Sequence, residues 1–161
     1  MLKLNRKQDY AILAVTHLSH PELQGPVSAR CLAESTRIPP SILANILKDL
    51  SRAGLVNSLR GVHGGYELAA APRDLSVGRL LRVLEGPTRL VECVVLPGEA
   101  ESTCGCDLKD ECQTRQPLQR IHDRIQQVLD DVTFDQLAAR VDASVQGPFP
   151  LGLPTESADV R

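Results

Sequence analysis

The chain has 161 residues, only 2% aromatic residues and a formal net charge of −2 at pH 7. This length suits one domain of ordinary size or a small domain with an appendage. Because aromatic residues are so few, the core must consist mainly of Leu, Ile, Val and Ala, and their helical spacing predicts a mainly α-helical protein. We found no signal-peptide or membrane-spanning pattern, so we expect a cytoplasmic protein without stable disulfides.

Charge is distributed unevenly along the chain. Residues 1–66 contain eight Lys and Arg against four Asp and Glu, whereas residues 67–161 contain ten against sixteen. A basic first part with an acidic remainder is typical of a nucleic-acid-binding module joined to a regulatory body. Exposed charges also commonly serve only solubility, so this indication needs support from motifs.

Two helices are predicted in the first 35 residues. Asn5 and Gln8 form a capping box that starts a helix over 6–19. One apolar face of this helix is predicted from its spacing: Tyr10, Leu13, Ala14, His17 and Leu18. Ser28 is predicted to cap a short second helix over 29–35, in which Cys31 is interpreted as a small buried apolar residue.

A third helix is predicted to open at Pro39-Pro40 and to end at Gly54. Apolar residues from Ile42 to Leu50 cover one arc that should face the core, while polar and basic residues lie opposite. Two short helices joined by a tight turn, the second with such a stripe, indicate a helix-turn-helix. An ordinary solvated helix face is the alternative. The candidate DNA contacts in these helices are Ser28, Pro40, Ser41, Asn45, Lys48 and Arg52.

A β-hairpin is predicted directly after the third helix, with strands over 55–60 and 66–69. A hairpin in this position is a wing. Arg60 at its tip is placed to enter a narrow minor groove. His63 is either a phosphate contact or an idle surface residue, and Gly64 lets the backbone approach a phosphate closely. The predicted fold is therefore mainly α with a small β-hairpin wing, a winged helix-turn-helix over residues 1–85.

Four cysteines lie within a segment over 86–116 that has no helix or strand pattern. Ser76 caps a fourth helix over 77–85 that precedes it. Thiolates are metal ligands, and the spacing of these residues suits an iron–sulfur cluster or a structural zinc. A disulfide, or a loop with idle thiols, is the alternative. The four residues are Cys93, Cys104, Cys106 and Cys112.

A long helix is predicted from Pro117, followed by a short one, so that the two cover 117–140. The long helix carries an apolar seam that a second copy would bury, which predicts a homodimer on a pseudo-palindromic double-stranded DNA operator. Docking on its own domain is the alternative. The seam consists of Leu118, Ile121, Ile125, Val128, Leu129 and Val132. His122 lies outside it and is expected to be solvated, and a tail over 141–161 is expected to be disordered.

Several short segments within residues 1–140 occur here in one order: Lys7-Gln8-Asp9-Tyr10-Ala11, Ile46-Leu47-Lys48, Ala53-Gly54-Leu55-Val56, Arg60-Gly61-x-x-Gly64-Gly65-Tyr66-x-Leu68, Glu92-Cys93, Cys106-x5-Cys112 and Pro117-Leu118-Gln119-Arg120-Ile121. In these segments the chain resembles the Rrf2 family of bacterial winged-helix transcription regulators. Members of that family regulate iron–sulfur biogenesis, nitric-oxide responses and rhizobial iron. The resemblance implies a homodimer with one 2Fe–2S or 4Fe–4S cluster per subunit, whose state changes DNA binding.

The resemblance also implies a ligand set. Cys93, Cys106 and Cys112 match the three cysteines of the family pattern, although the first gap is longer here. Cys104 is extra, either a substitute for Cys106 or a redox bystander. Some members place a histidine three residues after the last cysteine, where this chain has Arg115. Others are similar to this chain in carrying an aspartate in the first helix, so Asp9 from the partner subunit is the candidate fourth ligand; a plain surface carboxylate is the alternative reading.

Together these features predict a DNA-binding transcriptional repressor whose operator affinity is controlled by an iron–sulfur cluster. The alternative is a winged-helix regulator with structural zinc or no metal, insensitive to redox state. An enzyme is not expected, because no histidine or acid is placed to activate a cysteine and no phosphate-binding loop or nucleotide fingerprint occurs.

Overall fold

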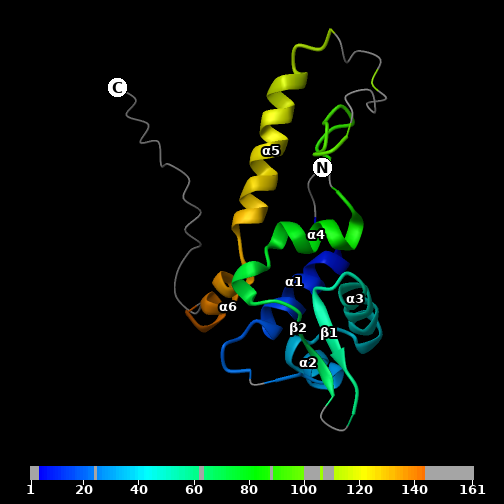
Figure 1. The fold of residues 1–161 in the computed structure, drawn as a ribbon, viewed down its shortest axis with the longest axis vertical. Coiled ribbons are helices and arrows are strands. Elements are labelled where there is room, and N and C mark those ends of the chain that lie inside the picture. The colour runs from blue at the N-terminus through cyan, green and yellow to red at the C-terminus, as the bar shows by residue number, and fades with distance from the viewer. Residues whose placement is uncertain are drawn as a thin grey trace.

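The structure, a computed structural model, describes residues 4–23, 25–61, 64–87, 89–99, 106 and 111–143. It is mainly helical with one two-stranded antiparallel hairpin, as predicted (Figure 1). Its elements are α1 (Arg6–Leu18), α2 (Ala29–Thr36), α3 (Pro40–Arg52), β1 (Val56–Leu59), β2 (Gly65–Leu68), the 3-10 helix η1 (Pro72–Asp74), α4 (Val77–Glu85), α5 (Arg115–Asp131) and α6 (Phe134–Ala143). No helix in this described part of the chain is long and apolar enough to cross a membrane.

The predicted helix caps are confirmed. The side chain of Asn5 accepts a hydrogen bond from the backbone of Gln8, and the Gln8 side chain accepts one in return. Ser28 and Ser76 cap α2 and α4, and the side chain of each accepts one backbone hydrogen bond from the third residue of its helix. The long helix begins at Arg115 rather than Pro117, because a proline in the first turn gives up only an N–H that has no partner within the helix.

The end of the chain differs in part from the prediction. Helix α6 continues to Ala143, so residues 141–143 are helical where a disordered tail was expected. The remainder of that predicted tail, 144–161, lies outside the described residues.

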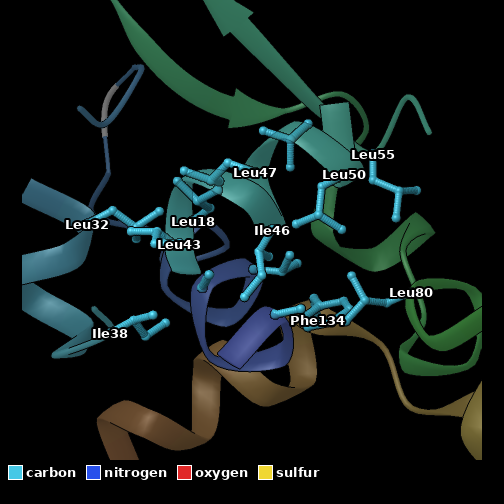
Figure 2. Close-up of a cluster of buried hydrophobic side chains, with 14 of the residues drawn as sticks. Leu18, Leu32, Ile38, Leu43, Ile46, Leu47, Leu50, Leu55, Leu80 and Phe134 are labelled. Carbon is cyan, nitrogen blue, oxygen red and sulfur yellow. The ribbon is translucent and has the colours of Figure 1, made fainter. Parts of the chain in front are cut away.

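The core lies where α1, α3, α4 and α6 meet. Its largest fully buried side chains include Leu43, Ile46 and Leu50 of α3. Figure 2 shows Phe134 and Leu80 converging with Ile46 in this cluster. Phe134 is the first residue of α6, so this aromatic side chain anchors the last helix in the core formed with α1, α3 and α4.

Three predicted side-chain orientations are wrong. The buried face of α1 is formed by Ala11, Ala14, Val15 and Leu18, and Leu13 is 44% exposed. Ala11 and Ala14 are fully buried, because their short side chains let neighbouring helices pack closely on this face of α1. Ile42 is 39% exposed at the start of α3. Cys31 is exposed too, because α2 buries only Leu32 and Ala33.

The hairpin is fastened to the helical part of the chain. Val56 pairs with Leu68 and Leu59 with Gly65. Val27 then exchanges two backbone hydrogen bonds with Tyr66, of 2.9 and 2.8 Å. A Cβ at residue 65 would stand 2.5 Å from the Val27 carbonyl oxygen, so glycine is required there. The hairpin therefore has a fixed direction relative to α2.

Helix α5 projects from the opposite end of the molecule to the wing (Figure 1). The Arg82 guanidinium of α4 makes a two-point contact with the Asp130 carboxylate of α5, at 3.0 and 2.6 Å. Gly78 of α4 lies against the same carboxylate, and a Cβ at this position would overlap it. Backbone bonds from Val77 to Val132 and from Phe134 to Leu75 close the junction. The α4–α5 junction is thus cross-linked by side chains and backbone.

Candidate nucleic-acid interface and cysteine segment

The recognition-helix candidate α3 exposes the predicted stripe. Arg37 ends α2 in the left-handed conformation, with φ of 56°, and so produces the tight turn before α3. All of the predicted α3 contacts are exposed to solvent: Pro40, Ser41, Asn45, Lys48 and Arg52. Ser28, at the start of α2, is exposed as well. The chain thus presents hydroxyl, amide and cationic groups along one surface, while contact with DNA stays a prediction.

An ion pair that the sequence did not indicate joins α3 to α1. Lys7 of α1 lies 2.7 Å from the Asp49 carboxylate of α3. The Lys7 hydrogen bond and charge lower the pKa of Asp49 below its usual value. No local sequence signal could have found this pair, because its members are far apart in the chain and only the packing of α1 on α3 joins them.

The wing keeps its predicted cation exposed. Arg60 directly follows β1 and is open to solvent. Gly64 donates a backbone hydrogen bond of 3.0 Å to Gly61, and a Cβ at residue 64 would overlap the backbone carbonyl of Leu59. Glycine at this position is therefore needed to close the turn itself. His63, the other predicted contact, lies outside the described residues.

The cysteine segment connects α4 to α5. Cys93, Cys106 and Cys112 are half-buried and form no disulfide, whereas Cys104 lies outside the described residues. In the portion of the chain that is described, no three His, Cys, Asp or Glu side chains are gathered closely enough to hold a metal ion. The thiols suit a metal chemically, but the described arrangement does not assemble the predicted set.

Cys112 lies just ahead of α5 in a setting that favours the thiolate. Its sulfur is 3.2 Å from the Thr114 hydroxyl. The hydrogen bonds of Thr114, followed by the backbone and charge of Arg115, lower the pKa of the Cys112 thiol below its ordinary value. Because a deprotonated sulfur is the form that ligates metals, this environment fits a thiolate ligand.

The first half of the cysteine segment folds back on α5. The Arg89 guanidinium is 2.5 Å from both carboxylate oxygens of Glu99. The Arg89 hydrogen bond lowers the pKa of Glu99 below its usual value. Gln119 of α5 accepts a bond from the Val95 backbone at 2.9 Å and donates one to the Val95 carbonyl at 3.1 Å. Cys93 therefore stands in an ordered turn beside the start of α5.

His122 is buried, and the expectation that it would be solvated is wrong. It is 4% exposed and lines a cavity of about 710 Å³ between α4, the segment over 87–99 and α5. His122 lies beside the predicted seam, because Leu118 and Ile125 are its neighbours on the helix surface. The irregular segment covers it, and an irregular segment gives no periodic signal from which such cover could be predicted.

The seam of α5 divides into two parts. Leu129 and Val132 pack against the core of their own chain. Ile121 and Val128 remain 50% and 42% exposed. Packing of α5 on its own chain thus accounts for the end of the seam next to α6. The residues Ile121 and Val128 are left on the surface of this chain.

The first turn of α1 connects the end of α4, which leads into the cysteine segment, to the recognition-helix candidate α3. Glu85, the last residue of α4, accepts hydrogen bonds from the Asn5 and Gln8 side chains, the second at 3.0 Å. Asp9, the candidate fourth ligand, is exposed in the same turn. The end of α4 that leads into the cysteine segment is therefore bound to the turn that carries Asp9 and Lys7.

A helix-turn-helix with an exposed polar and basic stripe, followed at once by a hairpin, defines a winged-helix DNA-binding protein. The chain belongs to the Rrf2 family, described as iron-dependent transcriptional regulators, whose profile matches residues 4–140. It is a DNA-binding transcriptional regulator rather than an enzyme, as its relatives are.

Relatives with solved structures share this fold over most of the chain. The chain is 32% identical to the transcriptional regulator CymR of Bacillus subtilis over 142 residues, which is 88% of this chain and 93% of CymR. The structure of CymR, the global cysteine regulator of that bacterium, matches with a TM-score of 0.67 over 87% of this chain and 98% of that chain. The IscR structure of T. potens matches with a TM-score of 0.66 and 30% identity, over 91% of this chain and 94% of that chain.

Proposed function

We propose that this regulator is a homodimeric repressor whose affinity for a pseudo-palindromic operator is set by one 2Fe–2S or 4Fe–4S cluster per subunit. The observation that carries the proposal is the concentration of half-buried thiols on the connection between α4 and α5. Similarity to IscR and to a family described as iron-dependent supports it. The regulatory site would then lie between the DNA-binding part and the helix that joins two subunits.

Cys93, Cys106 and Cys112 would hold the cluster, with Cys104 as a substitute ligand and Asp9 of the partner subunit as the fourth. When bound, a cluster supplies a redox-active centre that can be lost or altered by oxidants and by iron shortage. An oxygen ligand holds such a centre less firmly than sulfur does, which suits a sensor.

The contacts of this chain give the site a route to the DNA-reading surface. Glu85 binds the first turn of α1 through Asn5 and Gln8. In the same turn, Lys7 pairs with Asp49 of α3. A shift of the α4–α5 connection would therefore change the position of α1 and, through it, the angle of α3. Ligand state would bias two arrangements of these helices and so alter operator affinity.

The experiment is anaerobic purification followed by an absorption spectrum, iron and sulfide analysis, and DNA binding before and after chelation. Operator duplexes are first selected from a random library by the protein. We expect visible absorption, iron with sulfide, and a change of affinity after cluster removal. Cys112→Ala should abolish the iron and the change, whereas Cys31→Ala, a thiol exposed outside the segment, should keep both. Iron binding that survives Cys112→Ala would contradict the assignment.

The second candidate is a winged-helix regulator with structural zinc or no metal, whose DNA binding ignores redox state. Its metal-free form is favoured by the finding that the described residues gather no three metal ligands. The same purified protein separates the two functions. Zinc without iron or sulfide, together with unchanged operator affinity under oxidant, would support this candidate and overturn the cluster proposal.

A further inference from the structure

Ile42 stands out among the large apolar side chains of α3 because it is not part of the core. Leu43, Ile46, Leu47 and Leu50 of the same helix are all fully buried, whereas Ile42 is 39% exposed. Single exposed apolar side chains are common on protein surfaces, so the position of Ile42 is the informative fact. It lies in the first turn of the recognition helix, where the side chains that reach base edges are found in helix-turn-helix proteins.

The neighbours of Ile42 on the helix surface indicate which part of a base edge it would contact in the major groove. Residues three apart are adjacent on a helix surface, so Ile42 lies next to Asn45, and Ser41 precedes it. Ser41 and Asn45 are exposed and can form hydrogen bonds, while Ile42 can offer only apolar surface. In the major groove, the C5 methyl of thymine is the apolar group that a base edge presents.

We propose that Ile42 is a specificity-determining residue that packs on a thymine methyl group in each half-site, beside an adenine read by Asn45. The proposal rests on the proposed mode of binding, in which the exposed face of α3 enters the major groove. Burying the side chain against a methyl group removes apolar surface of both from water, and it gives no comparable gain against cytosine. The preferred half-site therefore contains an A·T pair at the Ile42 position.

The test uses a duplex that the full-length protein selects from a random library. Each thymine of the duplex is replaced in turn by deoxyuridine, which lacks only the methyl group. For the wild-type protein, the replacement at one particular thymine of either half-site should lower the affinity for the duplex about fourfold. This is the effect of ~0.8 kcal/mol for one buried methyl group. Ile42→Ala should bind the thymine and deoxyuridine duplexes equally, and Ile42→Val should keep part of the difference.

Leu59 of β1 supplies the matched control, because it is similarly exposed, at 43%. It belongs to the wing, which is expected at the minor groove, where thymine presents no methyl group. Leu59→Ala should therefore retain the full discrimination between thymine and deoxyuridine. The proposal is overturned if no thymine is sensitive in wild type or if Ile42→Ala keeps the sensitivity. Failure of the library to yield any preferred duplex would instead count against specific operator binding.

Discussion

Lys48 and Asn45 lie on the same exposed face of α3 but carry different chemistry. A lysine neutralises phosphate charge irrespective of sequence, whereas an amide can read an adenine edge. We expect Lys48→Ala to weaken binding to all duplexes and to reduce the slope of log affinity against log salt by about one. Asn45→Ala should weaken the selected duplex most. Fluorescence anisotropy titrations at several salt concentrations measure both effects.

Arg79→Ala is the control for lost charge. Arg79 is exposed on α4, outside the helix-turn-helix, the wing and the seam of α5. If removal of this cation reduced the slope of log affinity against log salt as much as Lys48→Ala, the net charge of the protein would explain the effect, and a specific phosphate contact of Lys48 would not be needed.

His17 makes the stability of the fold depend on pH. Burial, with a smaller contribution from His20, lowers the pKa of His17 below its ordinary value of 6.5. The unfolded chain therefore binds more protons than the folded one just below that pH, and the free energy of unfolding falls as pH drops through it. Denaturant unfolding of His17→Gln should show a smaller loss between about pH 7.5 and pH 5.5 than wild type.

His20→Gln provides the comparison for this effect. It removes the charge that repels a proton from His17 but leaves the burial, so its pH dependence should lie between those of wild type and His17→Gln. Identical curves for wild type and His17→Gln would show that another group causes the acid loss.

Gly78 and Asp130 determine how closely α4 and α5 pack. A Cβ at residue 78 would overlap the Asp130 carboxylate, so we expect Gly78→Ala to destabilise the fold by about 1–3 kcal/mol, the usual cost of overpacking. In an Asp130→Ala background the carboxylate is gone, although the Cβ would still lie 3.1 Å from the backbone nitrogen of Asp130. There, Gly78→Ala should cost less than about 1 kcal/mol, because alanine is the better helix former and offsets part of that remaining contact. Unfolding free energies of the four proteins form the cycle.

The smaller cost of Gly78→Ala in the Asp130→Ala background is the decisive outcome of this cycle. If Gly78→Ala destabilised the chain equally in both backgrounds, glycine would be needed for some reason other than the Asp130 contact. Loss of the Arg82 ion pair in Asp130→Ala is a separate and modest cost, because this pair is partly exposed.

The elements themselves were predictable where the signal was local. The capping residues Asn5, Ser28 and Ser76 act within a few residues of their own positions, and the wing glycines lie within a single turn. The faces were less predictable, because a helix with apolar residues on a wide arc has several possible buried sides. Leu13 and Ile42 fit the apolar arcs of their helices, and only the positions of the neighbouring helices leave them exposed.

The chemical groups of the candidate site could be predicted from the sequence, but their arrangement in space could not. The thiol groups and the basic stripe are evident in the sequence because they depend only on residue type and spacing. The Arg89–Glu99 and Gln119–Val95 contacts shape the cysteine segment, and they join irregular backbone to a helix without any periodic pattern. Burial of His122 beneath that segment could not be predicted for the same reason.

At the scale of the whole molecule, the exposed part of the α5 seam is expected to join two subunits. Ile121→Glu together with Val128→Glu would place charges in that contact, and we expect dimer dissociation constants to rise about a hundredfold or more. Sedimentation equilibrium measures the change, and circular dichroism checks that the helices persist. Gln127→Glu, on the side of α5 that lines the cavity beside α4, should leave association unchanged. A variant pair that stayed dimeric would place the interface elsewhere.

The cross-linked α4–α5 junction has a consequence for where such a protein can act in a genome. If α5 joins the subunits and cannot swivel on α4, the two recognition helices of the DNA-binding arrangement stand at one separation and one rotational phase. A single base pair inserted between half-sites shifts them by ~3.4 Å and rotates them by roughly a tenth of a turn. Candidate operators should therefore share one spacer length more strictly than they share any individual base. A promoter search constrained by spacing would separate true sites from chance matches better than one constrained by sequence alone.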